Sequence, residues 1–414
     1  MSLANPETSA ALSLLNARAV RERAHRMLAI GLEDRLPNFR IDLDRMDSTV
    51  DLVLETTRKA YPSFDVPFHS RWRHFVANGD DRWADIADQT EWPDRAARAR
   101  AEFDLAIVSV FLDAGAGPSW RYRDPKTGSA IGRSEGLGLA SLAMFAGGAF
   151  SADQSQPLRV DAGVLAKLSV AHLERGMQVS DVNPLVGIDG RVDLLRRLGT
   201  QVSSKPDVFG LLDTPRPGGL FDRLAMLANN QELPAPTILT ELLQQLGPIW
   251  PSRLTLGGIA LGDCWTHPMM TTADATSGLV PLHKLSQWLA YSLIEPLQRA
   301  GIRVTDIDGL TGLAEYRNGG LFVDIGMLAF RDADAARQEH GVASPLVVEW
   351  RALTVALLDR VADGLRHRLE LDATSLPLAK ILQGGTWAAG RLLARERRAD
   401  ASPPVKIISD GTVF

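Results

Sequence analysis

Apolar residues recur at helical spacing along most of the chain. A segment that begins at Pro93, a favourable first helical position, carries apolar residues every third or fourth position up to Leu112. Comparable stripes predict further helices over residues 164–173, 282–297, 346–361 and 376–395. Gly384 and Gly385 interrupt the last of these. A glycine inside a helix costs about 1 kcal/mol relative to alanine, so we expect a close contact or a break there.

Extended segments are few and short. The stretch "WRYRD" from Trp120 to Asp124 and the β-branched C-terminus "PPVKIISDGTVF" predict short strands. The pattern therefore predicts a mainly α, compact multi-helix fold with a few short strands. We expect an N-terminal helical subdomain over 1–130 and a helical catalytic subdomain over 131–414 that ends in a short strand. No linker is long enough to separate them, so the two should form one compact unit.

The composition is that of an ordinary globular protein, and it excludes several functional classes. The 414 residues are 45% hydrophobic and 23% charged, which suffices for a sizeable core. A net charge of −5 does not provide the excess positive charge that binds nucleic acid, and no apolar run is long enough for a membrane span. Cys264 is the single cysteine, and the N-terminus does not have the order of a signal peptide. These features predict a soluble cytoplasmic protein that binds neither nucleic acid nor membrane.

Familiar cofactor and nucleophile motifs are not matched. Gly136-Leu-Gly138 begins like a dinucleotide fingerprint, but Ser141 stands where the third glycine belongs and no strand precedes it. The sequence contains neither a GxxxxGK[ST] phosphate loop nor a G-x-S-x-G elbow. The terminal "KIISDGTVF" has an apolar run with one acid, Asp410, which is a poor match to a phosphoribosyltransferase.

A metal site is a weaker interpretation of "GDCWTHP" than a buried turn. Asp263, Cys264 and His267 are possible ligands there, with His283 further along the chain. Metal sites need clustered donors, and neither HExxH nor CxxC is present. We therefore expect no bound metal and keep His267 as a candidate for substrate contact.

Three segments concentrate polar and aromatic groups beyond what packing requires. In "HSRWRHF", the residues Arg71, Arg73 and His74 flank Trp72, and arginine forks suit phosphate or carboxylate. A solvated basic turn is the alternative for this segment. In "LVPLHKLSQWLAYSL", Lys284 begins a helix, although helix lysines are commonly just exposed.

The third segment, "TGLAEYRNGGLFVDIG", places two carboxylates close to an arginine. Glu315 precedes Tyr316 and Arg317, and Asp324 follows nine residues after Glu315. A carboxylate held against a sugar stabilises an oxocarbenium-like transition state or activates water. A structural Arg–Glu pair in a loop is the alternative that the sequence leaves open.

Long segments of this chain resemble a uracil-catabolism family of fungi and bacteria. They include "LTGLAEYRNGGLFVDIGML", "GDCWTH", "VVEWRALTVALLDRV" and "GGTWAAGRLLA", and the resemblance runs from about residue 8 to the end. The family is encoded beside a cyclohydrolase-like protein and a uracil phosphoribosyltransferase. It implies a pathway in which uracil is ribosylated, its ring is opened, and urea and a three-carbon acid are released.

A more distant resemblance, to queuosine-salvage N-glycosidases, is more specific about chemistry. That family carries Leu-Thr-x-x-Ala-Asp-Tyr-Arg, which is similar to Leu310–Arg317 here. Its helix-start lysine corresponds to Lys284, and its Glu-x-Arg-Ala helix resembles the segment from Glu349 to Ala352. The resemblance implies a fold similar to helix-hairpin-helix glycosylases with a lysine and an acid in a cleft. Glu315 replaces the family's Asp, so the backbone must reset the catalytic distance.

Together these resemblances imply an N-glycosidase-type hydrolase that releases urea from a ribosylated urea, free or as its 5′-phosphate, without a cofactor. The expected catalytic residues are Glu315, Lys284 and Asp324. The expected substrate contacts are Arg71, Trp72, Arg73, His74, Trp120, His267, Tyr316, Arg317 and Asp410. The expected partners are the small-molecule substrate and other uracil-catabolism proteins. The alternatives are a non-catalytic scaffold for those proteins and a metal-dependent hydrolase that uses Asp263, His267 and His283.

Overall fold

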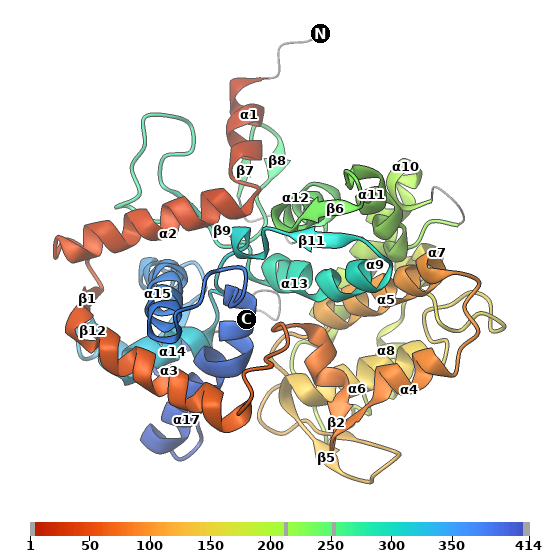
Figure 1. Cartoon of the computed structure of the whole chain (residues 1–414). Helices are drawn as coiled ribbons and strands as arrows, with labels where there is room; N and C mark the ends of the chain where they lie inside the picture. The colour runs from red at the N-terminus through yellow and green to blue at the C-terminus, as the bar shows by residue number, and fades with distance from the viewer. Residues whose placement is uncertain (1–4, 211–213, 251–253, 409–414) are drawn as a thin grey trace. The chain divides into compact units, whose positions relative to one another are not determined.

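A computed structural model describes residues 5–210, 214–250 and 254–408 (Figure 1). Its contacts divide the chain into two compact units that interleave along the sequence. The first unit, called unit one here, contains residues 1–69, 251–287 and 306–409. The second, unit two, contains 70–250, 288–305 and 410–414. The subdomains at 1–130 and 131–414, expected from the sequence to form one compact unit, stay a prediction.

The core of unit one forms around α15, whose side chains are buried almost all the way round. Leu353, Leu357 and Val361 have no exposed area or almost none, which is typical of a helix surrounded by protein. Helices α2, α3 and α14 pack against it, and Figure 1 shows α15 between α2 and α3. The helices of unit one are α1 (Pro6–Ser13), α2 (Ala17–Leu32), α3 (Met46–Ala60), α14 (Tyr316–Asp324), α15 (Pro345–Leu369), α16 (Leu378–Ile381) and α17 (Trp387–Arg397), with short turns η1 (Leu43–Arg45), η5 (Ile307–Gly309) and η6 (Ala335–Arg337).

Helix α14 packs closely against α15 because glycine replaces a side chain at the contact. A Cβ atom on Gly319 would lie 2.6 Å from the Trp350 ring, which is closer than real Cβ contacts come. The Trp350 indole N–H donates to the Gly319 carbonyl at 3.0 Å, so its polar atom is satisfied in the core. The glycines of "RNGG" therefore fix how deeply α14 sits in unit one.

The predicted interruption at Gly384-Gly385 is confirmed. Between α16 and α17 the chain forms a π-helical segment, η7 (Leu382–Thr386), instead of an α-helix. A Cβ on Gly385 would lie 2.4 Å from a methyl group of Val53 in α3, so the glycine permits this close approach. The break is thus a packing feature of unit one.

Unit two is built around α5, which is buried along most of its length. Helices α6, α9 and α11 pack against α5. The helices of unit two are α4 (Arg82–Asp88), α5 (Arg95–Phe111), α6 (Arg133–Ala146), α7 (Ala162–Ala166), α8 (Val170–Gly176), α9 (Ile188–Ser203), α10 (Pro206–Phe209), α11 (Leu220–Leu227) and α12 (Ala235–Leu246), with short turns η2 (Arg71–Phe75), η3 (Pro217–Gly219) and η4 (Gly247–Ile249). Helix α13 (Lys284–Arg299) begins with residues of unit one and continues with residues of unit two.

Every strand in the described ranges belongs to a two-stranded pair, so no extended sheet organises either unit there. In unit one the pairs are β1 (Phe39–Ile41) with β12 (Leu328–Phe330), β7 (Thr255–Leu256) with β8 (Ile259–Ala260), β9 (Cys264–Thr266) with β10 (Leu279–Pro281), and β13 (Glu339–Gly341) with β14 (Lys406–Ile408). In unit two they are β2 (Val76–Ala77) with β3 (Asp80–Asp81), β4 (Tyr122–Arg123) with β5 (Ala130–Ile131), and β6 (Glu232–Pro234) with β11 (Arg303–Thr305). The predicted strand segments near Trp120 and before Ser409 both contain short strands, β4 and β14.

The mainly α fold predicted from the sequence is confirmed, with two local corrections. Helix α5 starts at Arg95, because the Asp94 side chain accepts the N–H of Ala97 and caps the helix after Pro93. The helix predicted over 164–173 is instead two short helices, α7 and α8, because Ser169 caps a new start. No helix in the described part of the chain is long and apolar enough to cross a membrane.

Candidate functional site

The start of α13 in unit one is held by the carboxylate of Asp263, which precedes β9. The Asp263 backbone carbonyl accepts the N–H groups of Leu282 and His283 at 2.9 and 3.1 Å. Its carboxylate accepts the N–H of Lys284 at 2.9 Å. The first N–H groups of a helix have no partner within the helix, so this carboxylate acts as a cap from a distant segment. His283 has a φ of 46°, and this left-handed turn leads the chain into the helix at Lys284.

Glu315 is the N-cap of α14 and uses both of its carboxylate oxygens. Oε2 accepts the N–H of Arg317 at 2.7 Å, and Oε1 accepts the N–H of Asn318 at 2.5 Å. Asp, Asn, Ser and Thr are the usual N-cap residues, and Glu315, with the extended backbone that is ordinary for an N-cap, takes this place here. The helix thus fixes the orientation of the carboxylate that the sequence singled out.

The carboxyl of Glu315 is buried beside the positive charge of Lys284. Glu315 is only 7% exposed, and this burial raises the pKa of its carboxyl group above the ordinary value. The charge of Lys284 and the two backbone N–H donors oppose the shift but do not cancel it. The structure therefore brings Lys284 and Glu315 close enough to interact, and it leaves the acid easier to protonate than an exposed glutamate.

Arg351 connects the two backbone segments that carry this pair. Its Nη1 and Nη2 atoms each donate to one oxygen of Asp263 at 2.8 Å. Its Nε atom donates to the carbonyl of Ala314, directly before Glu315, at 3.1 Å. Burial alone would raise the pKa of Asp263, but the paired Arg351, with the N–H groups of Lys284 and Trp265, holds that pKa far below its usual range. Sequence reasoning missed this role, although the resemblance had aligned the Glu-x-Arg-Ala segment that contains Arg351.

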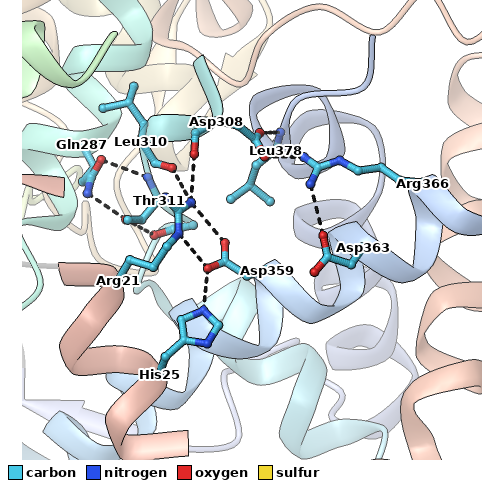
Figure 2. A network of polar contacts seen from close by, with 11 residues as sticks. Arg21, His25, Gln287, Asp308, Leu310, Thr311, Asp359, Asp363, Arg366 and Leu378 are labelled. Carbon is cyan, nitrogen blue, oxygen red and sulfur yellow. Dashed lines mark hydrogen bonds and ion pairs between the residues drawn. The ribbon is translucent and has the colours of Figure 1, made fainter. Parts of the chain in front are cut away.

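The loop before Glu315 is anchored at several points, as Figure 2 shows. Gln287 donates to the hydroxyl of Thr311 at 2.7 Å. Arg21 of α2 donates to the carbonyls of Asp308 and Leu310 at 3.0 and 2.7 Å. The same guanidinium forms an ion pair with Asp359 of α15 at 2.9 Å, so the loop is fixed to two helices of the core.

Asp324, the second expected catalytic carboxylate, lies at the other end of α14. It forms a bidentate ion pair with Arg398, whose Nη1 and Nη2 atoms donate to the two carboxylate oxygens of Asp324 at 2.7 and 2.5 Å. At a rise of about 1.5 Å per residue, the nine residues of this helix separate it from Glu315 by about 13 Å. The structure therefore does not bring Asp324 to the Lys284–Glu315 pair.

The two residues that follow Glu315, Tyr316 and Arg317, also have local partners. The guanidinium of Arg317 lies over the ring of Tyr316, 4.9 Å from its centroid. Its Nη1 atom donates to the carbonyl of Ala401 at 2.9 Å. Arg317 is buried, so these contacts hold α14 in place whatever else the residue does.

The residues considered for a metal site lie in unit one, where Asp263 and His283 have protein partners. No group of three or more His, Cys, Asp or Glu residues in the described ranges is arranged to hold a metal ion. His267 lies 3.3 Å from Glu349, and the Nε2 atom of His283 donates to the carbonyl of Leu14 at 3.0 Å. Burial is the main cause that raises the pKa of the Cys264 thiol, and the nearby charge of Asp263 adds to it.

The expected residues of "HSRWRHF" lie in unit two and are partnered there. Arg71 is fully buried and pairs with Asp113 at 2.8 Å, and its Nε atom donates to Ser109 at 2.6 Å. Burial lowers the pKa of Arg71, and Asp113 opposes that shift. Arg73 pairs with Glu295 at 2.7 Å.

The aromatic and imidazole groups of this set are also engaged within unit two. The indole N–H of Trp72 donates to the carbonyl of Ser292 at 2.7 Å. The indole of Trp120 donates to the carbonyl of Met177 at 2.9 Å and is completely buried. His74 lies 3.2 Å from Arg71. Asp410 lies outside the residues that the structure describes.

Comparison with known proteins places the chain in a family. A family model described as "Protein of unknown function (DUF1688)" matches residues 13–414. The chain belongs to this family. Protein urg3 of Schizosaccharomyces pombe is 36% identical to it over 415 residues, covering 98% of this chain and 100% of that protein.

A second relative of this DUF1688 chain carries a functional name. Uracil catabolism protein 4 of Lachancea kluyveri is 36% identical over 409 residues, covering 91% of this chain and 92% of that protein. The uracil-catabolism family that the sequence resembles is therefore confirmed.

Proposed function

We propose that this protein acts in uracil catabolism, as an enzyme that hydrolyses the N-ribosidic bond of a ribosylated urea and releases urea. The relative named uracil catabolism protein 4 supports the pathway. The observation that carries the reaction is Glu315, a buried carboxylate oriented by two backbone N–H groups beside Lys284.

The proposed step needs one carboxylate and one water molecule. The bond between C1′ and the urea nitrogen breaks, its electron pair stays on the nitrogen, and the sugar becomes an oxocarbenium-like cation. The Glu315 carboxylate stabilises that cation and accepts a proton from water as the water oxygen bonds to C1′. The proton that Glu315 accepts from water is passed on, directly or through solvent, to the departing urea nitrogen, so Glu315 is again a carboxylate and the products are urea and the free sugar or its 5-phosphate.

Lys284 has a positioning and electrostatic role in this proposal. Its charge opposes the rise in the pKa of Glu315 that burial causes, and so it keeps a larger share of the carboxylate ionised near neutral pH. The base form is the active one, so the rate should fall as pH drops through the raised pKa of Glu315.

The test is urea release from synthetic ribosylurea and from its 5′-phosphate. Glu315→Gln should lower kcat by about 10²- to 10⁴-fold, because the amide can neither take a proton nor carry the negative charge. Lys284→Gln should move the acid limb of the pH–rate profile to higher pH, since the influence that lowers the pKa of Glu315 is removed. Glu396→Gln is the matched control, as Glu396 is exposed on α17 and should leave the rate unchanged.

Two results would contradict the proposal in different ways. A folded wild-type protein that releases no urea from either substrate rules out the reaction and favours the scaffold alternative. A wild type that is active together with a fully active Glu315→Gln variant keeps the reaction but removes Glu315 from it.

A further inference from the structure

The two residues of the proposed catalytic pair come from separate segments of unit one. Lys284 is the first residue of α13, and Glu315 is the N-cap of α14. The charge of Lys284 acts on the carboxyl group of Glu315, so the two groups must be held near each other. A lysine side chain is flexible, and the separation of the pair is therefore set by the contacts that join α13 to the loop before Glu315.

Gln287 and Thr311 form a direct contact between these two segments. Gln287 lies three residues after Lys284, so the two side chains are neighbours on the surface of α13. The side-chain amide of Gln287 donates to the Thr311 hydroxyl at 2.7 Å and accepts the backbone N–H of Thr311 at 3.4 Å. Both residues are completely buried, so water does not compete for these bonds (Figure 2).

The chain between Thr311 and Glu315 has little freedom to move. The Thr311 hydroxyl donates to the carbonyl of Gly312 at 3.1 Å. The carbonyl of Leu313 accepts the N–H of Glu315 at 2.9 Å, so the chain turns tightly just before the cap. A Cβ atom on Gly312 would lie 2.6 Å from a methyl group of Leu358 in α15, which shows how closely the loop is packed. A displacement of Thr311 is therefore transmitted to Glu315.

Gln287 and Thr311 are neutral, and this distinguishes them from the Asp263–Arg351 pair. Arg351 also donates to the loop, but it is a buried charge whose partner is needed for stability. An amide and a hydroxyl that bond to each other can be replaced by an apolar pair of the same shape at little cost in stability. What their hydrogen bonds add is one defined position of the loop against α13.

We propose that Gln287 and Thr311 are positioning residues that set the distance between Lys284 and Glu315. The inference rests on the proposed hydrolysis, in which Glu315 stabilises the sugar cation and activates water. Gln287 and Thr311 act through the loop and not on the substrate. With their contact in place, the ammonium and the carboxylate meet at one distance. Without it, the loop shifts along α13 and the pair samples a range of distances.

The experiment compares wild type with the Gln287→Met, Thr311→Val double variant, which keeps both shapes and removes the hydrogen bonds. ¹³C NMR of the full chain, labelled at the glutamate carboxyl carbons, follows the titration of Glu315, whose signal is the one that Glu315→Gln removes. The pKa of Glu315 should rise in the double variant, because the charge of Lys284 that lowers it is held less closely. The charge of Arg317 also lowers this pKa, but Arg317 lies on α14 with Glu315 and should keep its place.

The route through Lys284 is tested by making the same two changes in a Lys284→Gln background. The pKa of Glu315 should then be the same with and without the contact, since the charge that the contact positions is gone. Thr311→Ser keeps the hydroxyl and should titrate like wild type.

The matched control is the Thr49→Val, Gln383→Met double variant, which makes the same chemical changes elsewhere in unit one. The Thr49 hydroxyl donates to the carbonyl of Arg45, and the Gln383 amide bonds to His69 and Tyr61. This variant should leave the pKa of Glu315 as it is in wild type.

An unchanged or lowered pKa of Glu315 in the folded Gln287→Met, Thr311→Val variant would overturn the proposal. An equal rise in the Lys284→Gln background would also overturn it, because the effect would not pass through Lys284. Circular dichroism and the unfolding temperature establish that the variant is folded. Gln287→Met alone, which keeps the Thr311 hydroxyl, provides the comparison if the double variant does not fold.

Urea release from ribosylurea separates this inference from the proposed function. With an active wild type, kcat of the Gln287→Met, Thr311→Val variant should fall by about ten- to a hundredfold, with a smaller change in KM, because the pair is misplaced during the reaction. A wild type that releases no urea contradicts the proposed hydrolysis, and the NMR titration still decides whether the contact positions Lys284 against Glu315.

Discussion

At the scale of single residues, Glu315 combines a structural and a proposed chemical role. As N-cap of α14 it satisfies two backbone N–H groups that would otherwise have no partner. The same two bonds orient the carboxylate, and burial makes it easier to protonate. The sequence identified Glu315, but its capping role and its burial depend on where α14 begins and what covers it.

Cys264 should be unreactive in the folded protein. It is completely buried, and burial raises the pKa of its thiol, so the thiolate that reacts with disulfide reagents is scarce. We expect no labelling by a chromogenic disulfide under native conditions and one equivalent in concentrated guanidinium chloride, since this is the only cysteine of the chain. Rapid labelling without denaturant would show that β9 opens readily in solution.

At the scale of elements, the segments around Glu315 are held by buried polar groups as well as by apolar packing. Arg351 lies on the central helix α15, pairs with the residue before β9 and donates to the loop before α14. The hydrophobic pattern of a single sequence can show that α15 is apolar, but it cannot show which distant carboxylate pairs with an arginine on that helix. For the same reason the sequence kept Asp324 as a second catalytic carboxylate after Glu315, and only its ion pair with Arg398 shows that it is engaged elsewhere.

Asp263→Asn should destabilise unit one by about 3 kcal/mol or more at neutral pH, because Arg351 stays buried without its charged partner. The pKa of Asp263 is depressed in the folded state, so its contribution is fully present above the unfolded value of about 3.9 and is lost as pH falls below it. The difference from wild type should therefore shrink below about pH 4. Urea unfolding followed by circular dichroism, at neutral pH and below about pH 4, measures this difference in the free energy of unfolding.

The control for this prediction is Asp65→Asn, which makes the same chemical change at an exposed position of unit one. Its stability should match wild type at both pH values. An Asp263→Asn variant as stable as wild type at neutral pH would mean that the Arg351 pair contributes nothing net to folding.

At the scale of the whole molecule, each unit is assembled from segments that are far apart in the sequence. Unit one needs its N-terminal helices together with the central part and the C-terminal third of the chain. A fragment of residues 1–250 should therefore leave α2 and α3 without α15, with their apolar faces in water. We expect this fragment to bind a hydrophobic dye, to aggregate and to unfold without a sharp transition.

The full chain, treated in the same way, is the reference for this test. A fragment that is monomeric and unfolds as cooperatively as the full chain would show that residues 5–69 find another core. Dye fluorescence, light scattering and thermal circular dichroism distinguish the two outcomes.

The sequence by itself determined the helical class, the long helices α5, α13 and α15, the interruption at Gly384-Gly385 and the family, because these depend on local periodicity and on long motifs. It also pointed to Glu315 and Lys284. Only the tertiary structure decided that Asp263 and Arg351 hold that pair, that Asp324 is engaged elsewhere and that the units interleave. The physical reason is that burial and ion pairing depend on residues far apart in the sequence, 88 positions for Asp263 and Arg351 and 74 for Asp324 and Arg398, which no local pattern encodes.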